Sequence, residues 1–512
     1  MPRDLVIGID SSTTATKAIA WDRTGAPIAE GRAAIPLANP RPRYFEQDPE
    51  DWWRSTSLAM RELTAKVDPA RIAGVAISNQ RETFGLFDEH GAPIRPAIVW
   101  LDERAIDSMR RFGASFGAER IHAISGKPVD ITPCVYRMVW LRENEPHLLD
   151  RAAYVAEVHG YLCFRLTGRW TTSTASADPL GVLDMERLVW SEEILAAAGI
   201  PINKMLSLVR PGAFIGKVTD ASANATGLPA GTPIFAGGGD GQCAGTGVDC
   251  LQSGRAYINL GTAVVSGCYS PRYVFDPAFR TETAVCDRGY IVETCLRSGT
   301  FLIDWMSREM LGIDPKREAE ALIALEAEAA ASPVGANGVM LVPYWEGCMT
   351  PYWDSSARGV IAGLSGSTKR GDLYRALLEG VALEQAMSSK RLQAASSQTI
   401  DHYIAVGGGT ASDLWMQILA DTTGVPIHRS ATKEASSLGA AIAAATGCAW
   451  FPTFTKASTT MSAHIVRTFD PRPNEKASYA KLAEIYTDLW PTLSTWNQKL
   501  THFTDHQPTK KT

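Results

Sequence analysis

The sequence lacks several features that would define other classes of protein. It has no continuous apolar run of about 18 residues or more, which argues against a transmembrane helix. Its formal net charge is −5, and no basic block precedes the short pair Lys510 and Lys511, which argues against nucleic-acid binding. An apolar segment begins at residue 5, which leaves no room for a signal peptide. We therefore expect a cytoplasmic protein that binds neither nucleic acid nor membrane.

Metal-binding and disulfide patterns are missing as well. The nine cysteines are scattered, odd in number and never spaced Cys-x-x-Cys, so neither a disulfide framework nor a cysteine metal site is expected. Reduced, buried thiols are the better interpretation. None of the nine histidines has the spacing of a metal ligand or a catalytic triad. A Gly-Lys-Ser/Thr phosphate loop is also absent from the N-terminal turn.

The sequence does have length and an alternating strand–helix pattern. Its 512 residues exceed what one hydrophobic core usually covers, which predicts two large domains. A strand, a small polar turn and a second strand occupy residues 5–22, and a similar pattern recurs at 255–269. The repeat predicts two related α/β domains, residues 1–250 and 251–490, followed by a C-terminal tail at 491–512.

Local signals predict further elements. Asp48 before Pro49 has the pattern of a helix N-cap followed by the first helical residue. Apolar residues at helical spacing predict a long amphipathic helix over 372–393. The Ala-rich segment 438–450 is too short to span a membrane and predicts a packed helix.

A Ser/Thr-rich turn at residues 10–17 is the first candidate for chemistry. Its hydroxyls and backbone N–H groups would suit phosphate oxygens. Asp10, at the strand end, could hold Mg²⁺ directly or through water. A plain hairpin turn is the simpler alternative.

A glycine run surrounds Asp240 after an apolar strand. Glycines let a ligand or another backbone approach closely, and one carboxylate in such a run is well placed as a general base on a hydroxyl. A turn with an Asx cap is the alternative.

Arg81 and Glu82 follow the predicted strand 72–78. Adjacent Arg and Glu side chains offer a donor and an acceptor to neighbouring hydroxyls, although an exposed surface ion pair is equally compatible with the pattern. Trp100 follows another apolar strand, and its ring could lie against a sugar. A buried core tryptophan is the more frequent case.

Glycines at 407–409 lie between a predicted strand at 403–406 and a helix that starts near Asp413. Such a segment suits a nucleotide, because glycines admit close approach and a helix N-terminus attracts anions. A simple tight connection is the alternative.

Taken in order, these motifs resemble the FGGY family of carbohydrate kinases, and the resemblance runs from about residue 4 to residue 450. Residues 8–17 resemble the family's first phosphate hairpin, and residues 46–53 are similar to a stretch typical of xylulokinases. Each segment alone is weak evidence, but their common order along the whole chain is specific. Other family-like segments are 162–168, 359–364, 372–379 and 434–441.

The resemblance implies a fold and a set of residue roles. The fold would be α/β, with two actin-like, ribonuclease-H-like domains and the active site in the interdomain cleft. The cofactors would be ATP and Mg²⁺, with Asp240 as the catalytic base and Asp10 near the metal. The remaining roles fall on substrate-binding Arg81, Glu82, Trp100, Asp240 and Gln242, and on cofactor-binding Thr13, Thr14, Lys17, Gly261, Thr262, Gly408 and Ser412.

Departures from the family pattern leave the substrate open. Arg137 stands where the first family signature usually has Lys, and the aromatic substrate residue of glycerol kinases is missing near Thr132. Residues 79–82 are similar to glycerol kinases, whereas xylulokinases usually carry Gln-Met-His-Gly there. We expect transfer of the γ-phosphate of ATP to a primary hydroxyl of a small sugar, best a ketopentose such as xylulose. The alternative is a polyol kinase acting on glycerol or a tetritol.

Two other functions share parts of this pattern. An actin-like assembly or chaperone ATPase has the same two-domain frame without a sugar site, and the residues Arg81, Glu82, Trp100 and Asp240 argue against it. A sugar-sensing pseudokinase is not supported, because the expected base is intact. By analogy with the family alone, a homodimer is a possible assembly.

Overall fold

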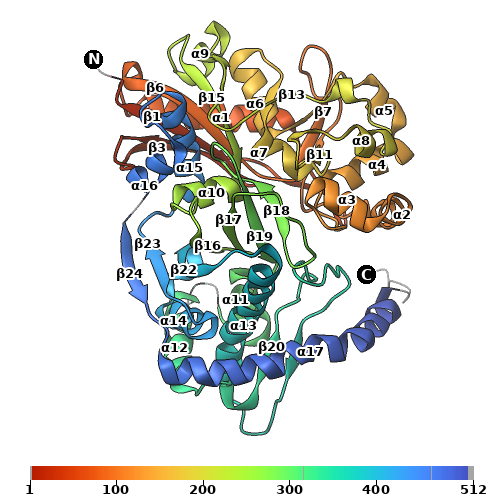
Figure 1. Ribbon diagram of the computed structural model, residues 1–512, viewed down its shortest axis with the longest axis vertical. Coiled ribbons are helices and arrows are strands. Elements are labelled where there is room, and N and C mark those ends of the chain that lie inside the picture. The colour runs from red at the N-terminus through yellow and green to blue at the C-terminus, as the bar shows by residue number, and fades with distance from the viewer. Residues whose placement is uncertain (1–2, 315, 317, 463, 506–512) are drawn as a thin grey trace.

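The computed structural model describes residues 3–505, apart from 315, 317 and 463, and contains two α/β domains (Figure 1). Each domain is built around one large mixed sheet. The first domain forms the upper part of Figure 1 and the second domain the lower part. The prediction of two α/β domains is confirmed.

The sheet of the first domain has six strands in the order β14-β15-β6-β1-β2-β3. β1 pairs antiparallel with β2 and parallel with β6, and β6 pairs parallel with β15. The strands are β1 (Leu5–Ser11), β2 (Ala15–Trp21), β3 (Pro27–Ala34), β6 (Ile72–Asn79), β14 (Phe214–Lys217) and β15 (Pro233–Gly239). A smaller sheet beside it consists of β4 (Ala38–Arg41), β5 (Tyr44–Gln47), β8 (Ala97–Ile98), β7 (Phe84–Phe87) and β9 (Tyr154–Glu157).

The sheet of the second domain has seven strands in the order β18-β19-β17-β16-β22-β23-β24. Its strands are β16 (Gly254–Leu260), β17 (Val264–Ser270), β18 (Arg280–Thr283), β19 (Tyr290–Leu296), β22 (Ile400–Val406), β23 (Ile427–Ser430) and β24 (Ile465–Phe469). The series β24-β23-β22-β16-β17-β19 repeats the order and the relative directions of β14-β15-β6-β1-β2-β3. The internal repeat that the sequence predicted is confirmed, and β18 is an addition to it.

Helices cover both faces of the first sheet. Ile7 and Ile9 face a cluster that includes α1 (Pro49–Thr64) and α6 (Val158–Thr167), whereas Val6 faces a cluster with α15 (Ala435–Gly447). A strand buried on both sides has apolar residues at successive positions, as β1 does. α15 belongs to the C-terminal half of the chain and yet packs on the first sheet, so closely that a Cβ at Gly8 would lie 1.8 Å from the Ser437 carbonyl oxygen.

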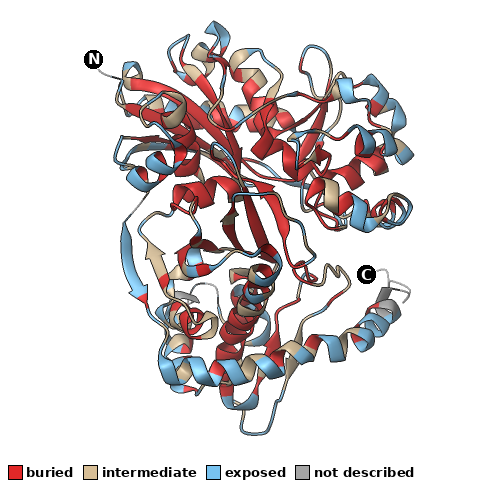
Figure 2. Ribbon diagram, viewed as in Figure 1, coloured by how far each residue is buried: buried red, intermediate tan, exposed pale blue. Residues whose placement is uncertain are grey.

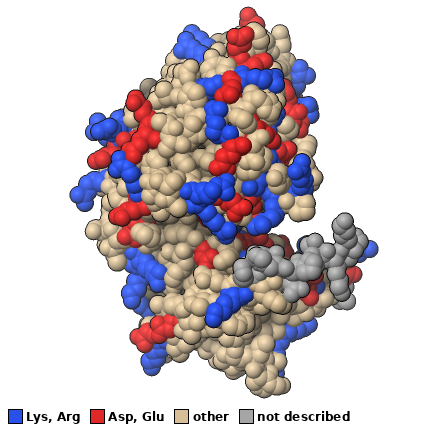
Figure 3. Space-filling model, turned by 90° about the vertical axis from the view of Figure 1, so that its right-hand side faces the viewer, with Lys and Arg blue, Asp and Glu red and all other residues tan. Residues whose placement is uncertain are grey.

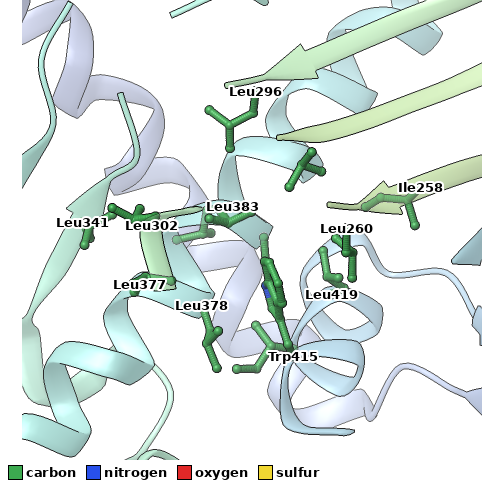
Figure 4. Close-up of a cluster of buried hydrophobic side chains, with 14 of the residues drawn as sticks. Ile258, Leu260, Leu296, Leu302, Leu341, Leu377, Leu378, Leu383, Trp415 and Leu419 are labelled. Atoms are coloured by element: carbon green, nitrogen blue, oxygen red, sulfur yellow. The ribbon is translucent and has the colours of Figure 1, made fainter. Parts of the chain in front are cut away.

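The core of the second domain lies between its sheet and the helices α13 (Arg370–Ser396) and α14 (Asp413–Thr423). Figure 2 shows that the central strands of both sheets are buried, whereas β24 at the edge of the second sheet is exposed. Trp415 of α14 is fully buried in this core. The predicted helix over 372–393 is confirmed, because α13 covers this range with a few more residues at each end. Figure 4 shows the cluster, with Ile258, Leu260, Leu296, Leu302, Leu341, Leu377, Leu378, Leu383, Trp415 and Leu419 labelled.

The C-terminal part of the chain is one long helix, α17 (Pro473–Asp505). It crosses residue 491, where the sequence predicted that a separate tail begins, and Asn497 and Thr501 donate hydrogen bonds to the carbonyl groups of Arg358 and Ser356. Asn497 and Thr501 thus attach this part of α17 to the second domain, and residues 506–512 of the predicted tail lie outside the described residues. α10 ends at Gly247 and β16 begins at Gly254. The predicted domain boundary at residue 250 falls between these two elements and stays a prediction.

The remaining helices complete the two domains. They are α2 (Ile106–Phe116), α3 (Ala118–Ser125), α4 (Cys134–Asn144), α5 (Pro146–Arg151), α7 (Thr174–Ala177), α8 (Glu192–Ala197), α9 (Asp220–Thr226), α10 (Asp240–Gly247), α11 (Thr300–Trp305), α12 (Glu318–Ala331) and α16 (Phe454–Met461). Within the described residues, no helix is both long and apolar enough to cross a bilayer. All nine cysteines are free thiols, and eight of them are buried.

Candidate active site

The two turns predicted as phosphate loops occupy equivalent places in the two domains. The first joins β1 to β2 and carries Thr13 and Thr14, and the second joins β16 to β17 and carries Gly261 and Thr262. In the second turn, the Gly261 carbonyl accepts a 2.8 Å hydrogen bond from the N–H of Thr300 at the start of α11. Because the sheets share one topology, each turn lies at the corresponding end of its sheet.

Asp10 lies at the end of β1, opposite Lys17 on β2. Its Oδ1 accepts a 3.0 Å hydrogen bond from the Ser78 hydroxyl, while Lys17 donates to both carboxylate oxygens of Glu434, at 2.6 and 2.7 Å. Burial and the nearby Asp240 carboxylate raise the pKa of Asp10 to about 7, although Ser78 and Lys17 act in the opposite direction. Asp10 and Asp240 are therefore neighbouring carboxylates whose combined charge a cation would neutralise.

Asp240 is the first residue of α10 and directly follows β15. Its Oδ1 accepts the N–H of Gly241 at 2.7 Å and lies 3.1 Å from Nε of Arg81. The Ser436 hydroxyl, at the start of α15, donates to the Asp240 carbonyl oxygen. Burial raises the pKa of Asp240 and Arg81 opposes this effect, yet the side chain is 41% exposed and can be reached by a substrate hydroxyl.

Arg81 and Glu82 follow the end of β6, and both are buried. Glu82 has a φ of 48°, in the left-handed region that few non-glycine residues adopt. The Glu82 carboxylate accepts a 2.8 Å hydrogen bond from Arg280, and Arg81 donates to Glu293 at 3.0 Å. Both partners belong to the second domain. The alternative of an exposed surface ion pair is therefore wrong.

Trp100 is not a core residue, because its side chain is 37% exposed. Its indole Nε1 donates a 2.8 Å hydrogen bond to the hydroxyl of Thr13 in the first hairpin turn. The indole is therefore attached to a predicted phosphate loop.

Gln242 does not join the other predicted substrate residues. Its side chain is fully buried, and its amide nitrogen donates to the Ala175 carbonyl at 3.0 Å and to the Asp178 carboxylate at 3.1 Å. Gln242 lies two residues after Asp240 in α10, so its side chain points into the protein while Asp240 remains exposed. The Gln242 amide nitrogen thus already has partners within the protein, and its contact with a sugar stays a prediction.

The predicted adenosine-binding residues lie between β22 and α14. Gly408 is exposed, and a Cβ placed there would meet no described atom within 4 Å, which leaves room for a ligand. Ser412 instead caps α14, because its hydroxyl accepts the N–H of Trp415 at 2.9 Å. Gly408 thus offers open backbone, whereas the Ser412 side chain already has a structural partner.

Arg137, the departure from the family signature, lies beneath the substrate residues. It is fully buried in α4. Its guanidinium donates to the carbonyl oxygens of Val99 and Glu82, each at 2.8 Å, and to that of Thr132. One side chain thus joins the segments that carry Trp100 and Glu82.

Sequence reasoning missed three charged residues on neighbouring strands of the second domain: Arg280 and Glu282 on β18, and Glu293 on β19. All three are buried. The available signal was a charge inside a strand that is otherwise apolar or made of Thr, because such a charge requires a buried partner. Together with Arg81 and Glu82 they form what we call the charge cluster.

A cavity of about 300 Å³ lies between the two domains. It is lined from the first domain by the β4–β5 turn and the start of α2, and from the second domain by residues 355, 356 and 358 together with Thr501 of α17. Figure 3 views the side on which α2 and the end of α17 lie and shows a hollow with basic side chains above it. None of the predicted site residues lines this cavity, which is a separate part of the interdomain space.

Comparison with known proteins decides the family. The FGGY family of carbohydrate kinases has an N-terminal domain that matches residues 5–247 and a C-terminal domain that matches residues 256–448. The chain belongs to the FGGY family of carbohydrate kinases. FGGY kinases are phosphotransferases that use ATP, so the predicted enzyme class is confirmed.

Relatives of two kinds resemble this FGGY kinase over most of its length. A xylulose kinase of Bacillus subtilis is 28% identical over 505 residues, 97% of this chain and 99% of the relative. A glycerol kinase of Citrifermentans bemidjiense is 31% identical over 461 residues, 87% of this chain and 90% of the relative. The crystal structure of a xyloylose kinase from Brucella ovis has a TM-score of 0.88 at 26% identity and covers 96% of this chain and 100% of that one. The predicted two-domain, actin-like fold is confirmed.

Proposed function

We propose that this FGGY kinase transfers the γ-phosphate of ATP to a primary hydroxyl of a small sugar, with a ketopentose such as xylulose as the first candidate. The observation that carries the proposal is the position of Asp240. Its carboxylate is next to Arg81 of the predicted sugar site and next to Asp10 of the first phosphate hairpin. A base in that position can serve a hydroxyl that faces a bound phosphate.

In this reaction Arg81 and Glu82 hold hydroxyls of the sugar, and Trp100 covers one side of it. Asp240 accepts the proton of the primary hydroxyl while the hydroxyl oxygen forms a bond to the γ-phosphorus. The bond between that phosphorus and the bridging oxygen breaks, and ADP leaves. Because phosphoryl transfer passes through a loose transition state, positioning and charge neutralisation contribute more than the base.

The residues around Asp10 fit a divalent cation. Burial and the neighbouring Asp240 raise the pKa of Asp10 to about 7, and a cation at this place would offset the repulsion between the two carboxylates. Asp10 would hold Mg²⁺ directly or through water, and the ion would neutralise the phosphate oxygens. Thr13, Thr14, Gly261 and Thr262 would contact the phosphates, and Gly408 the adenosine.

A polyol such as glycerol or a tetritol is the second candidate substrate. Arg81 and Glu82 at the end of β6 favour it, as does the 31% identity to a glycerol kinase. The identity of 28% to a xylulose kinase over nearly the whole chain favours the ketopentose.

The test is ADP release from Mg-ATP with D-xylulose, L-xylulose, D-ribulose, L-ribulose, glycerol, erythritol and gluconate. A strong signal with one or two ketopentoses supports the proposal. A signal with glycerol or erythritol alone moves the enzyme to the polyol branch. Silence with every sugar, from protein that is folded and binds ATP, counts against kinase activity on this class of substrate.

A further inference from the structure

The strand pair β18–β19 of the second domain reaches into the sugar site of the first. The N–H of Thr283 on β18 donates to the buried Asp178, and the Lys127 ammonium donates to the carbonyl of Thr281. Lys127 also lies 3.1 Å from Glu282. β18 is therefore fastened to the first domain by hydrogen bonds and an ion pair.

Glu293 on β19 is the centre of the charge cluster. Its carboxylate accepts hydrogen bonds from Nη1 of Arg81 at 3.0 and 3.1 Å, from Nε of Arg280 at 2.7 Å and from the Tyr257 hydroxyl at 2.7 Å. The side chain is fully buried. Burial alone would raise the pKa of Glu293, but the two guanidinium groups outweigh it and lower the pKa to about 2.

Arg280 continues the chain of contacts to Glu82. Its Nη1 donates to Glu82 at 2.8 Å while its other nitrogens contact Glu293. The resulting series is Glu82, Arg280, Glu293, Arg81 and Asp240, in which acidic and basic groups alternate. Every predicted polar sugar contact except the buried Gln242 is held by this series.

Space around the series is tight. A Cβ at Gly241 would lie 3.0 Å from the guanidinium carbon of Arg81 and 3.0 Å from Oε2 of Glu293. The two side chains thus fill the room above the first turn of α10. A buried ion network is weak evidence for stability, because apolar residues of similar volume often stabilise a core as well or better. An orienting role explains better why charges occupy these positions.

We propose that Glu293 and Arg280 are positioning residues that orient Arg81 and Glu82 for the sugar. The inference rests on the proposed function. Glu293 fixes the Arg81 fork, so that its Nε is directed at Asp240, and Arg280 fixes the Glu82 carboxylate at its strained backbone position. Because both positioning residues belong to the second domain, the sugar site is complete only when β18 and β19 are docked on the first domain.

The cluster also affects the charge on Asp240. Glu293 raises the pKa of Asp240, and Arg81 and Arg280 lower it. The charged groups that face Asp240 from the surrounding elements are Asp10, Arg81, Glu82, Arg280 and Glu293.

The first test is Glu293→Gln, which keeps the shape and removes the charge. Misplacing a substrate-holding group costs about 100-fold in the most sensitive cases, so we expect the sugar KM to rise about 10- to 100-fold. We expect the KM for ATP to change less than about twofold. The lost contacts position groups that hold the sugar and not ATP, so the weaker binding should appear in the sugar KM alone.

A matched control lies in the second domain. Glu379 is also buried and accepts hydrogen bonds from an arginine, Arg375, at 2.6 Å and from a tyrosine hydroxyl, Tyr479, at 2.8 Å. Glu379→Gln should lower the Tm and leave the sugar KM unchanged. The control separates the loss of a buried ion pair from the loss of sugar positioning.

The double variant Glu293→Gln/Arg280→Gln guards against misfolding. It removes one charge of each sign, so the cluster keeps its net charge and the protein should fold, as measured by Tm and by ATP binding. We expect it to keep the raised sugar KM. If the wild type is active and the folded variants retain a normal sugar KM, the inference alone is overturned. A wild type that neither binds nor phosphorylates any sugar of the panel would overturn the proposed function and the inference with it.

Discussion

The two domains share one strand order and place opposite kinds of residue at equivalent strand ends. In the first domain β1 ends with Asp10 and Ser11, and β6 leads into Arg81 and Glu82. In the second domain the equivalent β16 ends with two uncharged residues, Asn259 and Leu260, and the equivalent β22 leads into glycines 407–409. One backbone frame thus presents charged side chains on one half and, on the other, a glycine segment with open space at Gly408. Charged side chains can bind sugar hydroxyls and a metal ion, whereas glycine backbone allows the flat base of a nucleotide to approach closely.

The largest effect on activity should come from substituting a charged residue of the first domain. We expect Asp240→Asn to lower kcat about 10²–10⁴-fold, because that is the usual cost of losing a positioned base. Sugar and ATP binding and the Tm should stay close to wild type. The measurement is steady-state ADP release with the preferred sugar, combined with ligand titrations. Asp220→Asn is the control, because Asp220 is also the first residue of a helix but is exposed. Near-normal turnover of Asp240→Asn would remove this residue from the base role.

Asp10→Asn should have the next largest effect. We expect activity or Mg²⁺ affinity to fall about 10- to 100-fold, as is usual for groups that orient a metal or its ligands. The measurement is ADP release as a function of free Mg²⁺. An unchanged Mg²⁺ dependence would place the metal elsewhere.

Asp10 also predicts a pH effect on stability. Its pKa is raised to about 7 in the folded protein, so the folded state binds this proton more tightly than the unfolded chain does. Stability of the ligand-free protein therefore falls as the pH rises from about 4 toward 7. Without Mg²⁺, Asp10→Asn should have a higher Tm than wild type at pH 8, and the difference should shrink toward pH 4. A constant difference in Tm would contradict the raised pKa.

A substitution in the glycine segment of the second domain should affect nucleotide binding alone. We expect Gly408→Leu to raise the KM for ATP about tenfold, which corresponds to about 1.4 kcal/mol, and to leave the sugar KM unchanged. The side chain would occupy space that is open in this structure, so the Tm should not fall. Gly366→Leu is the control, since Gly366 is also exposed with open space around it. An altered sugar KM in Gly408→Leu would mean that the two halves do not divide the substrates.

The smallest effect should come from Arg137→Lys. A single ammonium cannot reproduce the planar fork that reaches three carbonyl groups, and an unsatisfied buried polar group costs about 1–3 kcal/mol. We expect a lower Tm and a severalfold rise of the sugar KM, because Glu82 and Trp100 lose a common anchor. Arg142→Lys on the same helix is the control, since Arg142 donates to the Gly199 carbonyl from a partly exposed position. Equal changes in both variants would mean that Arg137 only stabilises the fold.

Much of the fold could be predicted because its signals are local. The hairpin of residues 5–22 follows from two apolar strands around a polar turn, and the start of α1 follows from Asp48, whose side chain accepts the N–H of Glu50. The repeat near residue 255 was visible for the same reason. The packing of α15 on the first sheet could not be predicted, because nothing in the sequence of an Ala-rich helix indicates which surface it covers.

The candidate site divides in the same way. Asp10, Arg81, Glu82 and Asp240 stand at strand ends or helix starts, and the structure brings them together, while Trp100 contacts Thr13 of the first hairpin. Gln242, Ser412 and Lys17 were inferred from their place in a motif, and each proved to have a structural partner: Asp178, the N–H of Trp415, and Glu434. Motif position gives no information on which way a side chain points.

The sequence by itself determined the strand–turn–strand units, their repetition and the residue types at the strand ends, because these depend on neighbours a few residues apart. Only the tertiary structure decided that Arg81 meets Glu293, which is 212 residues away in the chain. Such a contact depends on how one domain docks against the other. Long-range ion pairs of this kind leave no periodic pattern in the sequence. Burial and the path of β18 and β19 across the cleft determine which charged groups meet.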